Sequence, residues 1–122
     1  MNDISFIHIS AINRARSAMW HEEGEPWSLA DWSNAMCGEA GELANVIKKI
    51  RRIETSTHGR YTEQDRAALV EKAKLEVADV YLYLDLLLEQ LDDHASMPNV
   101  VAAKFNITSD EYGFPHKLPV VS

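Results

Sequence analysis

Two pairs of carboxylates are the residues of this chain best suited to chemistry. Glu39 and Glu42 form the first pair, and Glu76 and Asp79 form the second. Each pair has a spacing of three residues, so on a helix both of its side chains project from one face. Such pairs on two neighbouring helices would bring four carboxylates together.

The positions around these pairs are apolar at helical spacing. Glu39 fills a gap in the first apolar stripe, and Glu76 fills a gap in the second. The first stripe is Leu29, Trp32, Met36, Leu43, Val46 or Ile47, and Ile50; the second is Leu69, Ala73, Val80, Leu84, Leu87 and Leu91. A carboxylate in a core is costly unless it is paired. Four converging carboxylates therefore predict a compensating cation, and a hard divalent ion is the obvious one.

The expected cofactor is Mg²⁺ or Mn²⁺, with more than one ion in a site, because these metals prefer oxygen ligands. The pattern lacks the His of Glu-x-x-His, which disfavours zinc and di-iron centres. Metals held in this way orient a polyphosphate and activate a water, and Glu39 or Glu42 could act as the base. Lys49, two turns after Glu42, and Lys104 are candidate phosphate ligands.

Simpler interpretations stay open for each feature alone. A single Glu-x-x-Glu is usually a solvated helix face, and the basic run Lys48–Arg52 suits the negative end of a helix dipole. Trp20, Trp27 and Trp32 are more often core or interface residues than base-stacking platforms. The metal interpretation rests on the conjunction of two acidic pairs, each interrupting an apolar stripe of a long helix.

The predicted architecture is all-α, a bundle of two long helices plus shorter ones, completed within or between subunits. The first expected helix covers about 4–20, and the second runs from the N-cap Ser28 to about Arg52, followed by a loop over 53–61. A long helix is expected from about Glu63 to Asp92 or His94, and a short one from Pro98 to about Phe105. The segment over about 107–122 is expected to be an irregular tail. Thr62 with Asp65 marks the N-cap of the long helix. The 122 residues are expected to form a single domain over 1–122.

The overall composition narrows the class of partner. The net charge is −7, with 19 acidic and 12 basic residues, which argues against polymeric nucleic acid or an anionic membrane. Cys37 is the single cysteine, so a disulfide framework is excluded and a reducing compartment is expected. No signal peptide is evident at the start, and the apolar run Val80–Leu91 is too short to span a bilayer. We therefore expect a cytoplasmic protein.

The acidic pairs and their surroundings resemble a known family. Gly38-Glu39-Ala40-Gly41-Glu42-Leu43-Ala44 and Leu75-Glu76-Val77-Ala78-Asp79-Val80-Tyr81 are similar to the signature of the MazG-like all-α nucleoside triphosphate pyrophosphohydrolases, a superfamily that includes dimeric dUTPases and dCTP pyrophosphatases. Val101-Ala102-Ala103-Lys104-Phe105-Asn106 and Tyr112-Gly113-Phe114-Pro115 resemble the tail of short phage- or mobile-element-type members. The resemblance extends over roughly residues 27–118.

The resemblance implies an enzyme that converts an NTP or dNTP to the monophosphate and pyrophosphate. Glu39, Glu42, Glu76 and Asp79 match the family's metal ligands, and Lys49, Arg52, Tyr83, Lys104 and Asn106 match positions that contact phosphate or sugar. Family members assemble as dimers or tetramers, so a homodimer or homotetramer is expected. Where many members carry an Arg, this chain has Ser109-Asp110-Glu111, so Lys117 or the other subunit would supply that cation.

The substrate's base stays open. Asn13 could bind a base edge, and Trp20 or Trp32 could stack on it. Such an enzyme could either remove non-standard nucleotides or remodel the dNTP pool, with dGTP or dCTP as candidate substrates. The alternatives are a dUTPase-like diphosphohydrolase and a non-enzymatic all-α interaction module, which metal dependence and product analysis would separate.

Overall fold

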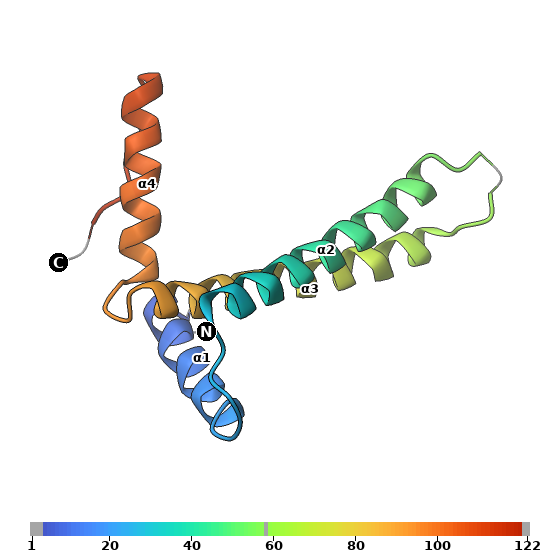
Figure 1. Ribbon diagram of the computed structural model, residues 1–122. Coiled ribbons are helices and arrows are strands. Elements are labelled where there is room, and N and C mark those ends of the chain that lie inside the picture. Colours follow the sequence, from blue (N-terminus) through green and yellow to red (C-terminus); the bar gives the residue numbers. More distant parts are fainter. Residues whose placement is uncertain (1–3, 58, 121–122) are drawn as a thin grey trace. The chain divides into compact units, whose positions relative to one another are not determined.

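The computed structural model describes residues 4–57 and 59–120 and confirms the all-α prediction. Within these ranges there are four helices and no strand: α1 (Phe6–Trp20), α2 (Leu29–Glu54), α3 (Glu63–Leu91) and α4 (Met97–Tyr112) (Figure 1). His58 and the last two residues of the predicted tail lie outside the described residues. None of the described helices is long and apolar enough to cross a membrane.

The two long helices start at the predicted caps. Ser28 accepts a hydrogen bond from the Asp31 backbone N–H at 3.2 Å, and the Asp31 carboxylate accepts one from the Ser28 N–H at 2.8 Å. Thr62 and Asp65 form the same reciprocal pair before α3, at 3.2 and 2.7 Å. These caps satisfy backbone donors that have no partner within the first turn.

The chain divides into two compact units. One consists of residues from Trp27 to Leu87, and the other combines residues up to Pro26 with those from Leu88 onward. The first unit is a hairpin in which α2 and α3 run antiparallel (Figure 1). The predicted single domain over 1–122 stays a prediction.

The hairpin has a small core near its loop end. Val46, Ile50 and Ala73 are buried there, and Leu43, Leu69 and Val70 pack around them. Beyond this core, Arg66 of α3 bonds the Glu54 carboxylate of α2 at 2.8 Å. These contacts set the register in which α2 residues face α3 residues.

In the other unit, α1 contacts α4, and the tail returns along α4. The Asn106 amide donates to the Leu118 carbonyl at 2.9 Å and accepts from the Leu118 N–H at 2.7 Å. Lys117 forms an ion pair with Asp110. Leu118 also lines an apolar pocket with Phe6 and Val101.

Two predicted boundaries were wrong. The fourth helix continues past Phe105 to Tyr112, so the segment 107–112 is helical and not part of an irregular tail. Its stop signal is Gly113, whose φ of 73° places it in the left-handed region that glycine adopts without steric cost. Likewise α2 continues two residues past Arg52, to Glu54.

Candidate metal centre

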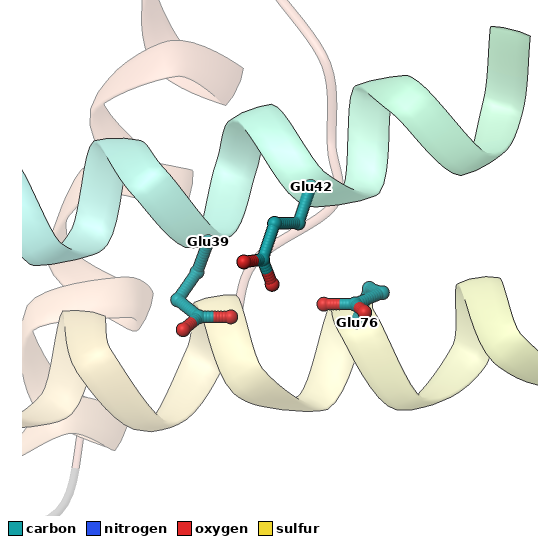
Figure 2. Close-up of side chains that lie close together, drawn as sticks. All are labelled: Glu39, Glu42 and Glu76. Atoms are coloured by element: carbon teal, nitrogen blue, oxygen red, sulfur yellow. The ribbon is translucent and has the colours of Figure 1, made fainter.

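Three of the four predicted carboxylates converge between the helices of the hairpin. Glu39 and Glu42 of α2 and Glu76 of α3 each offer an oxygen, and these oxygens lie within 4.8 Å of one another. Figure 2 shows the three side chains directed into the space between the two ribbons. The i,i+3 spacing of the first pair places both of its carboxylates against α3.

Burial distinguishes the members of the cluster. Glu39 and Glu76, the residues that interrupt the apolar stripes, are half-buried, whereas Glu42 is exposed. The Oε2 atom of Glu76 is buried and has no hydrogen-bond partner. A buried carboxylate oxygen without a partner is costly, so this atom suits a ligand that supplies positive charge.

The electrostatics of the cluster favour protonation of Glu39. Partial burial is the largest cause of its raised pKa, followed by the negative charges of Glu42, Asp79 and Glu76. A hydrogen bond between the Glu39 and Glu42 carboxyl groups raises the pKa further. Like charges held this close disfavour ionisation of one another unless a cation compensates them.

Asp79, the fourth predicted ligand, is exposed and lies one turn after Glu76 on α3. It is not one of the three residues whose oxygens converge, but its charge contributes to the raised pKa of Glu39. The donor set is thus three carboxylates together with a fourth close enough to act on Glu39. All four supply only oxygen, which is the ligand that Mg²⁺ and Mn²⁺ prefer, so the residues fit the expected ions.

Four other predicted site residues belong to the hairpin unit. Lys49 and Arg52 are exposed on α2, and Tyr83 is half-buried on α3. Trp32 is only 5% exposed, and its ring centroid lies 4.7 Å from that of Trp27. The Trp32 ring is therefore packed within the protein, which favours the core interpretation of this residue over stacking on a base.

The remaining predicted residues belong to the other compact unit. Asn13 is buried, whereas Trp20 and Lys104 are exposed. Both polar groups of the Asn106 amide bond Leu118, and Lys117 pairs with Asp110. Asn106 and Lys117 thus have a structural role in holding the tail, and their contact with phosphate or sugar stays a prediction.

Sequence reasoning missed one unusual carboxylate. Asp85 is fully buried, and its charge, after burial, contributes to the raised pKa of Tyr81 one turn earlier on α3. It follows Glu76 by nine residues, about two and a half turns, and so lies on the opposite face of α3 from the cluster. The available signal was its position inside the apolar run Val80–Leu91.

Gly38 and Gly41 are exposed positions of α2, each next to a cluster glutamate in the sequence. A Cβ atom at either position would meet nothing within 4 Å, so packing within this chain does not require glycine there. Each glycine nevertheless weakens α2 by about 1 kcal/mol relative to alanine.

Comparisons of the chain with known protein families, with curated proteins and with solved structures gave no match.

Proposed function

We propose that this protein is a metal-dependent nucleoside triphosphate pyrophosphohydrolase, which converts an NTP or dNTP and water to the nucleoside monophosphate and pyrophosphate. The observation that carries the proposal is the convergence of Glu39, Glu42 and Glu76, including the buried, unpartnered Oε2 atom of Glu76. The resemblance of both acidic motifs to the MazG-like enzymes supports this reaction over other metal-dependent hydrolyses. On this proposal the chain is a member of that superfamily and acts as an oligomer.

Glu39, Glu42, Glu76 and Asp79 would hold Mg²⁺ or Mn²⁺. When bound, such ions neutralise phosphate charge and make a water more acidic. The water oxygen forms a bond to the α-phosphorus, and the bond from that phosphorus to the bridging oxygen breaks. Pyrophosphate departs with the bridging oxygen, and a carboxylate oxygen of Glu39 or Glu42 accepts the proton of the water.

The protein's own contribution is mainly to hold these groups in place. The capping box at Ser28 fixes the start of α2, and the core around Val46 and Ala73 fixes its register on α3. Because the carboxylates are presented from two packed helices, they are oriented before the substrate arrives. Pre-oriented charge needs no reorganisation at the moment of reaction.

The test is release of pyrophosphate and monophosphate from a panel of NTPs and dNTPs, with Mg²⁺, with Mn²⁺ and with EDTA. We expect metal-dependent turnover that is lost in Glu76→Gln. Glu71→Gln is the matched control, because Glu71 is an exposed α3 residue that pairs with Lys74 and lies outside the cluster. The fastest substrate identifies the base, with dGTP and dCTP as the first candidates.

The outcomes separate the alternatives. Preference for dUTP would favour the dUTPase-like alternative, and release of phosphate in place of pyrophosphate would identify a different phosphohydrolase. An absence of turnover across the panel would overturn the proposal in favour of the helical interaction module. Several large apolar side chains of the hairpin are exposed, including Ile47, Leu75 and Val77, and they would provide contacts for such a module.

A further inference from the structure

Basic residues are concentrated at the loop end of the hairpin. Residues 48–74 contain eight Lys and Arg against four Asp and Glu, whereas the rest of the chain contains four against fifteen. Arg66 pairs with Glu54, and Lys74 pairs with Glu71. The other six are all exposed: Lys48, Lys49, Arg51, Arg52, Arg60 and Lys72.

Two of these six basic residues, both lysines, share helix faces with the carboxylate cluster. Lys72 precedes Glu76 by four residues, so it lies one turn away on the same face of α3. Lys49 follows Glu42 by seven residues, so it lies about two turns away on the same face of α2. Since Glu42 and Glu76 converge, both lysines lie on the edge of the hairpin where these carboxylates meet.

The register places both lysines on one side of the cluster. The core of Val46, Ile50 and Ala73 and then the Glu54–Arg66 ion pair follow the cluster toward the loop, and Lys49 and Lys72 lie in this stretch. In the other direction, residues 27–38 of α2 and its cap and residues 80–87 of α3 contain no Lys or Arg. Within the hairpin, the basic residues near the cluster therefore lie on its loop side.

Charge balance shows why this direction matters. Two divalent ions would balance the four carboxylates and leave the roughly four negative charges of a triphosphate uncompensated. Lysine is a compact point charge that binds phosphate, and Arg52, one turn after Lys49, adds a third cation. The two lysines would compensate about two of these four charges, and Arg52 would compensate a third.

We propose that Lys72, acting with Lys49, binds the phosphate chain of the substrate, so that the triphosphate extends from the carboxylate cluster toward the loop between α2 and α3. The nucleoside then lies on the other side of the cluster, toward the start of α2. This inference rests on the proposed function. What it adds is Lys72 as a binding residue and the direction of the substrate along the hairpin.

The experiment measures binding of inorganic tripolyphosphate to the full chain by titration calorimetry in the presence of Mg²⁺. We expect Lys72→Gln to weaken binding roughly tenfold, as is typical for the loss of one charged hydrogen bond. Lys74→Gln is the matched control, because Lys74 is also exposed on α3 but pairs with Glu71. Lys49→Gln is compared in the same way with Lys48→Gln, which changes the neighbouring residue on a different face of α2. The Kd of each control for tripolyphosphate should stay within twofold of the wild-type value.

Mg²⁺ titration without tripolyphosphate and the KM for a turned-over dNTP complete the test. Lys72→Gln should leave the affinity for Mg²⁺ within twofold and raise KM by roughly the same tenfold factor. Equal losses in Lys72→Gln and Lys74→Gln would overturn the inference, because they would show a diffuse charge effect. If the wild type hydrolyses dNTPs but the lysine variants bind like it, this inference alone fails; if the wild type neither hydrolyses dNTPs nor binds tripolyphosphate, the proposed function fails with it.

Discussion

Replacing Glu76 by Gln should make the metal-free protein more stable while abolishing its response to metal. At a separation of 4.8 Å, the outer limit within the cluster, two negative charges repel by about 0.9 kcal/mol in water and by roughly 3.5 kcal/mol at an effective dielectric constant of 20. Because Glu42 is exposed and Glu39 is only half-buried, we take the lower value for both neighbours of Glu76, so removing its repulsion with them yields at least about 2 kcal/mol. A buried amide donor without a partner costs about 1 kcal/mol in return.

The net gain is about 1 kcal/mol, which corresponds to a rise in Tm of roughly 3–5 °C for a chain of this size. Mg²⁺ or Mn²⁺ at a hundred times its Kd should stabilise the wild type by about 2.7 kcal/mol. The same addition should leave Glu76→Gln nearly unchanged. Thermal unfolding by circular dichroism, with metal and with EDTA, measures both effects.

The control is Glu71→Gln, which removes one carboxylate from the exposed Glu71–Lys74 pair of the same helix. Metal should raise its Tm as much as it raises that of the wild type. In EDTA its Tm should lie within about a degree of the wild-type Tm, since exposed ion pairs contribute little to stability. A lower Tm of metal-free Glu76→Gln, or equal metal responses in the two variants, would refute the reasoning. Either result would mean that the three carboxylates do not act as a strained, cation-requiring group.

Three further predictions concern the caps, the protonation of the cluster and the tail. Thr62→Ala should lower the free energy of unfolding by about 1 kcal/mol in urea titrations, because it removes the side-chain acceptor at the start of α3; an unchanged midpoint would contradict the capping role. The raised pKa of Glu39 means that the folded state binds this proton more tightly than the unfolded chain does, so the carboxyl opposes folding increasingly as pH rises from 4.5 through its folded-state pKa. Glu39→Gln should therefore become more stable than the metal-free wild type over this pH range and keep a constant advantage above it. The measurement is the free energy of unfolding against pH, and parallel curves for the two proteins at all pH values would exclude the effect. Asn106→Ala should lose both hydrogen bonds to Leu118, and hydrogen exchange should show faster exchange of the Leu118 amide with little change at amides inside α2.

The helices could be predicted from the sequence because their signals are local. Ser28 with Asp31, and Thr62 with Asp65, each define a start within four residues, and the structure contains both reciprocal bonds. The end of α4 was not predicted, because Gly113, Pro115 and Pro119 indicate an irregular segment but do not show how far the helix before them extends. In the structure the helix continues up to Gly113, which caps it.

The cluster was predictable only in part. An i,i+3 spacing shows that two carboxylates share a face, but the meeting of Glu42 with Glu76 depends on the register of two helices, which arises from side chains such as Val46 and Ala73. The role of Asn106 was not predictable, because its partner is a backbone group twelve residues away in a segment without regular structure. Whether the cluster binds metal stays a prediction.

The uneven distribution of charge along the hairpin also affects how an anion would reach it. The net charge of −7 alone implies that the protein repels anionic ligands and that added salt, by screening this repulsion, speeds their arrival. Residues 48–74 carry eight basic against four acidic residues, a net charge of +4, and their field acts in the opposite sense within about 10 Å, the screening length at 0.1 M salt. On the proposed function, an anionic substrate is guided to one end of the hairpin, and its association is expected to slow as ionic strength rises. The sign of the ionic-strength dependence of substrate association would then reflect the charges near the site and not the net charge of the whole chain.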